Sequence, residues 1–271
     1  MKNVMLLTDF SEDAKHAIYY GLKLFGDEDM KYTLIHGMFL RYANTGALAS
    51  AVDVRTELAR NSFATLLAEI RQDFPDKHFD IEIEIRCGEI ESVVTHMEKT
   101  RPADLIIMGT RGAGGLADVL MGTSTVAIME QVSTPVLAVP ASFDFQDPAK
   151  IVLAMDNGEG PPPSVLQPMV KIAERFDAQV LVIHVAKEEN SQQINHDKVN
   201  AVLSNVRSHC VTIHDEDVSN GLGRYVKSEK VQMLSMIKQK LNFFERVFHR
   251  SLSNKMVMQT DVPMLVMSHK A

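Results

Sequence analysis

The sequence predicts an α/β protein with two tandem open parallel sheets, each of five strands flanked by helices. Short apolar runs alternate with amphipathic helical segments through residues 1–140, the pattern of a parallel sheet covered on both faces. The pattern restarts near residue 150. A glycine-rich loop follows one apolar run in the first half and has no equivalent in the second. These observations predict two copies of one domain that differ at one loop.

In the first half, turn and capping residues separate five apolar runs. Ser11 before an acidic turn predicts a helix N-terminus, and Gly26 predicts the end of that helix. Residues 79–86 alternate isoleucine with charged residues, so this strand should bury one face and lie near a sheet edge. Residues 38–52 are expected to form a loop. The expected strands are 2–8, 32–36, 79–86, 105–108 and 133–140, and the expected helices are 12–25, 54–73, 89–99 and 116–121, with a further helix start near Thr123.

Three of these strands recur in the second half with similar sequence. Residues 150–156 parallel 2–9, residues 181–185 parallel 33–37, and residues 261–267 parallel 133–139. The spacing between the copies shortens by about 20 residues in the middle of the second. We therefore expect domains at 1–140 and 150–271, joined by a linker at 141–149.

Composition restricts the classes of function. Of 271 residues, 45% are hydrophobic and 23% charged, and no apolar run is long enough to cross a bilayer. Residues 1–140 hold 13 Lys and Arg against 20 Asp and Glu, and residues 141–271 hold 15 of each. Neither half has the basic excess of a nucleic-acid binder. With two widely spaced cysteines and no signal-peptide core, a cytoplasmic protein without disulfides, membrane span or nucleic-acid partner is expected.

The stretch Asp104–Ser124 carries the strongest functional signal. A buried run, 105–108, leads into four glycines and then into Gly122-Thr123-Ser124. Glycines let backbone N–H groups approach an anion, and a helix N-terminus adds unpaired donors with partial positive charge. In the second half, Ile237, Lys240 and Arg250 stand where Gly109, Gly112 and Gly122 stood. Side chains there would remove positive-φ freedom and block close approach. The alternative is that the glycines only permit tight helix–sheet packing.

The spacing Gly109-x2-Gly112-x9-Gly122-Thr123, with TDFSE after the first strand, resembles the ATP-binding members of the universal stress protein family. The resemblance covers nearly all of residues 1–140 and the second half more weakly. It implies a Rossmann-like, adenine nucleotide alpha hydrolase-like fold, with the two fifth strands paired in an internal pseudo-dimer. It also implies a nucleotide site made by Leu7, Thr8, Asp9, Gly37, Met108, Gly109, Arg111, Gly112, Gly115, Gly122, Thr123 and Ser124.

Within that resemblance, ATP is the implied ligand, alone or with Mg²⁺ held through water at Asp9. Gly37 stands where the family usually has an aliphatic residue, and Leu7 where it often has Pro, so the phosphate half of the site is better supported than the adenine half. No Walker lysine or other catalytic motif is present. The leading hypothesis is an ATP-binding stress-response protein that presents a nucleotide-dependent surface to a protein partner. The alternatives are a slow ATP hydrolase or adenylating enzyme, and a nucleotide-free scaffold. His36 and His184, which recur at one repeat position, are expected to be packed or capping residues.

Overall fold

The computed structural model divides the chain into two compact units, Met1–Thr134 and Pro135–Ala271. Within them the structure describes residues 2–27, 29–39, 48–112, 121–155, 161–186, 199, 201–215, 218–238 and 261–268. Among these residues, no helix has both the length and the apolar content needed for a membrane crossing.

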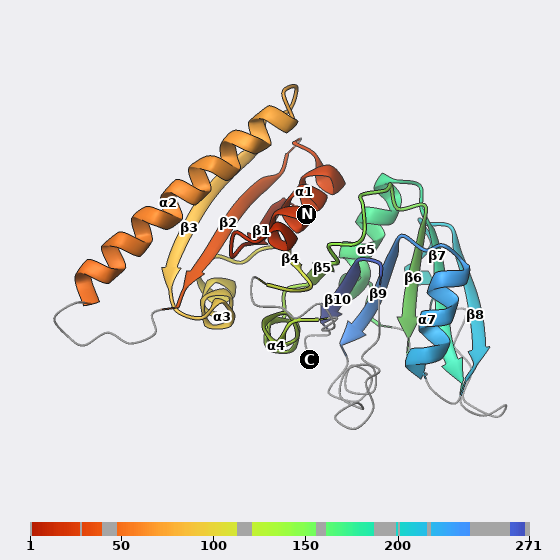
Figure 1. Ribbon diagram of the computed structural model, residues 1–271. Coiled ribbons are helices and arrows are strands. Elements are labelled where there is room, and N and C mark those ends of the chain that lie inside the picture. The colour runs from red at the N-terminus through yellow and green to blue at the C-terminus, as the bar shows by residue number, and fades with distance from the viewer. Residues whose placement is uncertain are drawn as a thin grey trace. The chain divides into compact units, whose positions relative to one another are not determined.

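The first unit is a parallel sheet in the order β3-β2-β1-β4 (Figure 1). Its elements are β1 (Asn3–Leu7), α1 (Glu12–Phe25), β2 (Lys31–Met38), α2 (Leu48–Asp73), β3 (Asp80–Cys87), α3 (Ile90–Thr100), β4 (Leu105–Gly109) and α4 (Thr123–Gln131). The central strands β1 and β4 are buried almost throughout, because both faces of the sheet are covered. The predicted α/β class is confirmed.

Helices α1 and α2 lie side by side in this unit. Lys15 Nζ is 2.7 Å from Glu69 Oε2, and Tyr19 donates a 2.8 Å hydrogen bond to Asp73. The chain steps from β1 to β3 in one direction and then crosses back to β4. Because parallel crossovers are right-handed, α3 and α4 cover the opposite face from α1 and α2. The carboxyl ends of all four strands meet at one edge, where ligands of open α/β sheets bind.

Most of the predicted boundaries in this unit hold to within one or two residues. Ser11 caps α1 by accepting a 3.3 Å hydrogen bond from the Ala14 N–H, and Gly26 ends the helix at φ 70°. Strand β3 is outermost, as its alternation predicts. The expected burial of its isoleucine face is wrong, because no residue of β3 is buried and Ile83 is 42% exposed. The expected loop at 38–52 is wrong in part, because β2 continues to Met38 and α2 begins at Leu48. Residues 48–53 contain no Gly or Pro to stop the helix from extending N-terminally. Of the helix expected at 116–121, only Met121 lies within the described residues.

The second unit has the strand order β5-β10-β9-β6-β7-β8. Its elements are β5 (Val136–Val139), β6 (Lys150–Met155), α5 (Pro163–Arg175), β7 (Gln179–Ala186), β8 (Ser208–His214), α7 (Val218–Ser228), β9 (Met233–Lys238) and β10 (Met264–Ser268). The four strands β8-β7-β6-β9 are parallel and repeat the order β3-β2-β1-β4 of the first unit. This common order supports the repeat inferred from sequence.

Strands β5 and β10, the two predicted fifth strands, pair antiparallel, with Leu137 opposite Leu265. This pairing was expected from the resemblance. Because β5 joins the sheet of the second unit, the compact units divide after Thr134. The first repeat in the sequence, by contrast, is expected to end at residue 140. The sequence boundaries 1–140, 141–149 and 150–271 remain a prediction about where each repeat ends.

Candidate functional site

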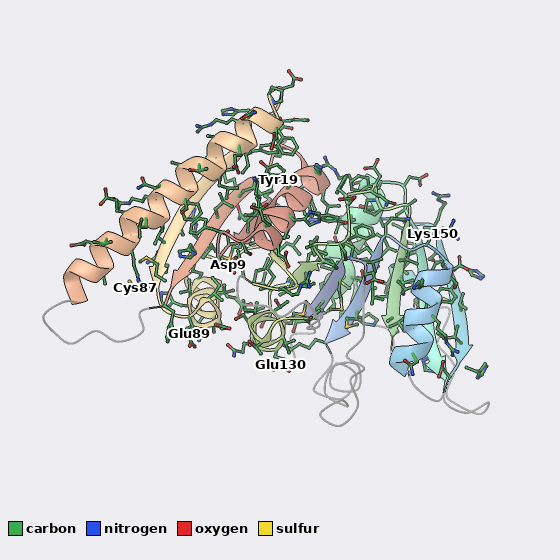
Figure 2. The ribbon with its side chains drawn as sticks, viewed as in Figure 1. Asp9, Tyr19, Cys87, Glu89, Glu130 and Lys150 are labelled. Carbon is green, nitrogen blue, oxygen red and sulfur yellow. The ribbon has the colours of Figure 1, made fainter. Side chains whose placement is uncertain are left out.

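The turn after β1 presents Asp9 at the carboxyl edge of the first sheet (Figure 2). Thr8 is buried, and its N–H donates to the Ile35 carbonyl of β2 at 2.9 Å. Phe10 then takes a left-handed φ of 63°, which is rare for an aromatic residue. Asp9 Oδ1 accepts hydrogen bonds from Ser11 N at 3.0 Å and Ser11 Oγ at 2.5 Å. The carboxylate is therefore oriented by the residue that caps α1.

The glycine loop after β4 lies against this carboxylate. A Cβ placed on Gly112 would lie 2.8 Å from Asp9 Oδ2, so the two residues approach closely although 103 positions separate them. A Cβ on Gly109 would lie 3.1 Å from the Asp13 carbonyl oxygen at the start of α1. A side chain at either position would push the loop away from α1. The close approaches seen at these glycines are to α1 and the turn before it, as the packing alternative expects, and approach of the loop to an anion stays a prediction.

The predicted need for positive φ is wrong at the described loop glycines. Of the described glycines, only Gly26 and Gly88 have positive φ, and Gly122 adopts φ −66° and ψ 153°, which any residue can adopt. Space, not backbone conformation, therefore explains Gly109 and Gly112. Gly115 lies outside the described residues, as do the counterparts Lys240 and Arg250.

The N-terminus of α4 completes the edge. Gly122 donates its N–H to the Thr110 carbonyl at 2.6 Å, and Thr125 Oγ1 donates to the Gly109 and Thr110 carbonyls at 3.2 and 3.3 Å. These bonds anchor the helix start to the end of β4. Gly122 offers no capping side chain, and the first turn of α4 contains no acidic residue. The N–H groups of Thr123 and Ser124 have no acceptor within the helix, so this end can receive an anion.

Arg111 places a cation beside the same loop. Its Nε lies 3.2 Å from Asp13 Oδ2, and both side chains are about 30% exposed or less. An ion pair this exposed is weak, so Asp13 can yield the guanidinium to an incoming phosphate. Arg111 thus lies beside Gly112 and pairs with the start of α1, and its part in a nucleotide site stays a prediction.

Three predicted residues contribute differently. Leu7 and Met108 have buried side chains, so only their backbone could meet a ligand. Gly37 packs on the β3–α3 connection, since a Cβ there would lie 3.1 Å from the Gly88 carbonyl oxygen and from Ile90 Cα. Figure 2 shows Cys87 and Glu89, the neighbours of Gly88, where β3 ends and α3 begins. The three atoms nearest to such a Cβ all belong to this connection and none to the glycine loop.

Sequence reasoning missed the supporting residues. It treated Ser11 and Asp13 as helix-start signals, but they also hold Asp9 and Arg111. Thr125, two residues after Thr123, ties the helix to the loop through its hydroxyl, and its position in the run Thr123-Ser124-Thr125 was the available signal. No group of three or more His, Cys, Asp or Glu side chains within the described ranges could hold a metal ion.

The second unit differs at the equivalent edge. Ile237, the counterpart of Gly109, is buried with 6% exposure in β9.

His36 Nδ1 donates to the Thr8 carbonyl at 2.9 Å, as expected for a packed histidine. His184 is 4% exposed, and neither of its ring nitrogens has a hydrogen-bond partner among the residues that the structure describes. Asp156 lies outside the described residues.

Comparison with known proteins agrees with this geometry. The family model described as "Universal stress protein family" matches residues 1–140, more than half of the chain. The chain belongs to the universal stress protein family. The comparison with curated proteins gave no significant match.

Solved structures of the family show the same fold over the whole chain. A universal stress protein from Archaeoglobus fulgidus DSM 4304 is 16% identical with a TM-score of 0.71, and the match covers 98% of this chain and 96% of that one. A putative universal stress protein from Pseudomonas aeruginosa UCBPP-PA14 is 12% identical with a TM-score of 0.59, covering 99% and 93%. The functionally unknown protein PA1789 from Pseudomonas aeruginosa PAO1 gives the same values. At these identities the likeness shows the fold alone.

Proposed function

We propose that this universal stress protein binds ATP, alone or with Mg²⁺, at the carboxyl edge of its first unit. The observation that carries the proposal is the close approach of Gly112 to Asp9 beside the uncapped N-terminus of α4. Packing alone does not require helix N–H groups without an intrahelical acceptor next to an oriented carboxylate. The N–H groups at the start of α4, the guanidinium of Arg111 and the carboxylate of Asp9 suit different parts of one nucleotide.

Each group has a role that follows from its chemistry. The N–H groups of Thr123 and Ser124 would donate to phosphate oxygens, with the helix dipole adding favourable potential. Arg111 would leave Asp13 and pair with phosphate. Asp9 Oδ2 would accept from a ribose hydroxyl, or from water bound to Mg²⁺, while Ser11 holds Oδ1.

The function proposed for this site is regulatory binding in the stress response. The surface would have two states, with and without the negative charge of bound ATP. A protein partner would recognise one of these states. No described group stands ready to activate a water, since Asp9 is occupied on one oxygen by Ser11. An evolved hydrolase or adenylating enzyme would instead show sustained turnover that depends on Asp9.

Isothermal titration of the full chain with ATP tests the proposal. The matched variant is Gly122→Val, because a Cβ there meets nothing closer than 3.4 Å and φ −66° suits valine, so the fold should persist. We expect saturable binding by the native protein and its loss in the variant at unchanged thermal stability. No binding at millimolar ATP, or equal binding by the variant, would contradict the proposal.

A further inference from the structure

The sheet of the second unit ends in β8, and among the described strands only β7 pairs with it. Strand β8 is last in the strand order and lies at the outer end of that sheet in Figure 1. The Val180 N–H donates to the Arg207 carbonyl at 2.8 Å, which fixes the phase of the ladder between β7 and β8. The backbone groups that point away from β7 therefore belong to Ser208, Cys210, Thr212 and His214. Such an edge can pair with a further strand.

The outer strand of the first unit, β3, is protected by charge, whereas β8 is not. Strand β3 carries Asp80, Glu82, Glu84 and Arg86. If two β3 strands paired antiparallel about Ile83, Glu82 of one would lie opposite Glu84 of the other, and like charges in that place are unfavourable. Strand β8 reads SHCVTIH and contains no Lys, Arg, Asp, Glu or Pro. It therefore lacks the residues that usually keep an edge strand from pairing.

Strand β8 is complementary to a second copy of itself. When two β8 strands lie antiparallel with Val211 at the two-fold axis, all 7 residues of each strand overlap. Cys210 of one copy then lies opposite Thr212 of the other. Both residues direct their backbone groups outward, so they can exchange hydrogen bonds. The two Val211 residues form a close pair between these bonds, and β-branched side chains suit such a pair.

The charges that flank β8 match in the same register. Arg207 and Asp215 are equally far from Val211 along the chain, so Arg207 of one copy lies opposite Asp215 of the other. Arg207 is 65% exposed, and its 3.0 Å pair with Asp177 is weak enough to exchange. Asp215 pairs with Arg224, and a carboxylate can accept from more than one guanidinium. Parallel pairing would instead set like charges together, so the flanks favour an antiparallel copy of the same strand.

We propose that β8 is an interaction surface through which two copies of this chain associate, edge to edge and antiparallel about Val211. One pair of strands buries less area than a standard interface, so the association is weak, with a dissociation constant on the order of micromolar. The surface includes no residue of the proposed nucleotide site.

Sedimentation velocity of the full chain, from low to high micromolar concentration, tests this. We expect a concentration-dependent dimer that Thr212→Pro abolishes, because proline removes an outward N–H group. Ile83→Pro is the matched control on β3. The Gly88 N–H donates to the Met38 carbonyl, so the Ile83 N–H also points outward, and this variant should still dimerise. Arg207→Glu should weaken the dimer about tenfold by setting like charges opposite each other.

Cross-linking tests the register. In a chain with Cys87→Ser and Cys210→Ser, Val211→Cys should form a disulfide-linked dimer under mild oxidation, since the two side chains meet at the axis. Ile213→Cys should not, because Ile213 of one copy lies opposite His209 of the other.

Three results would overturn the proposal. They are a monomer at every concentration, a dimer that Thr212→Pro and Arg207→Glu both leave unchanged, or linkage through Ile213→Cys and not through Val211→Cys. Arg207, Thr212 and Ile83 are exposed, and thermal melts check that their variants fold. If Thr212→Pro does not fold, Arg207→Glu and the cross-links decide. Gly122→Val should dimerise normally, so loss of ATP binding would refute the proposed function and leave this inference standing.

Discussion

The carboxyl ends of β4 and β9 occupy equivalent places in two units with the same strand order, yet they differ in what lines them. Strand β4 ends at Gly109, where a Cβ would crowd the backbone of Asp13, so backbone surfaces meet directly. Strand β9 carries Ile237 at that place, and its side chain is buried. A parallel sheet accommodates either a glycine or a buried side chain at this place, because the strands pair through their backbones. The repeat therefore keeps the fold, while the space beside the strand end is filled by the backbone of Asp13 and Arg111 at Gly109 and by a buried side chain at Ile237.

The largest effect on stability should come from removing the side chain of Ile237 in β9. Ile237→Ala removes a buried side chain, so the free energy of unfolding should fall by about 2–5 kcal/mol. Scanning calorimetry of the full chain would show the transition of the second unit shifted down. A loss below about 1 kcal/mol would mean that Ile237 does not fill the space that distinguishes β9 from β4.

Two helix glycines provide a matched test of close packing in the two units. A Cβ on Gly21 of α1 would lie 2.7 Å from Ile107 Cδ1, so Gly21→Ala should cost about 1–3 kcal/mol by overpacking. Gly223 of α7 has nothing within 4 Å, so Gly223→Ala should stabilise by about 0.5–1 kcal/mol through helix propensity. Chemical denaturation of both variants measures this. Stabilisation by both would show that the first unit is less tightly packed than described.

The contact between the glycine loop and the Asp9 turn should be sensitive to one methyl group. In Gly112→Ala the new Cβ displaces the Asp9 carboxylate, and ATP affinity should fall by about tenfold or more. Titration calorimetry gives the affinity, with Gly223→Ala as the control expected to bind normally. An unchanged affinity in Gly112→Ala would separate Asp9 from the nucleotide site.

Much of this architecture follows from the sequence, because apolar strands alternating with capped helices leave few topologies open. Ser11 and Gly26 bound α1 as predicted, since capping is local chemistry. The start of α2 was missed because Ser50 and Asp53, residue types that favour an N-cap, lie within the helix and not at its start. The left-handed Phe10 was also missed, since tertiary packing on His36 and Phe63 imposes it. Likewise, contacts between distant segments, such as Arg111 with Asp13, were not readable from spacing alone.

A smaller effect is expected from that ion pair. Asp13→Asn removes the 3.2 Å ion pair with Arg111, so ATP should bind a few-fold more tightly, in line with the roughly 0.2–1 kcal/mol of an exposed pair. The gain should shrink at high salt because screening weakens the competing pair in the native protein. Weaker ATP binding by the variant would assign Asp13 a direct role in holding the ligand.

Each unit carries one free cysteine, and their reactivities should differ modestly. Cys87 is exposed at the end of β3, whereas Cys210 is half-buried in β8 and burial raises the pKa of its thiol. Since the thiolate is the nucleophile, a disulfide reagent at pH 8 should label Cys87 first. Mass spectrometry of partly labelled protein would identify the order. Faster labelling of Cys210 would indicate that β8 is more open than described.

The most direct test of a nucleotide site confined to the first unit is residue-resolved amide chemical shifts during ATP titration. We expect the N–H signals of Gly112, Thr123 and Ser124 to move together with one affinity, while those of Ile237 and Lys238 remain in place. Movement of the β9 signals, or no movement at the start of α4, would contradict a site confined to the first unit.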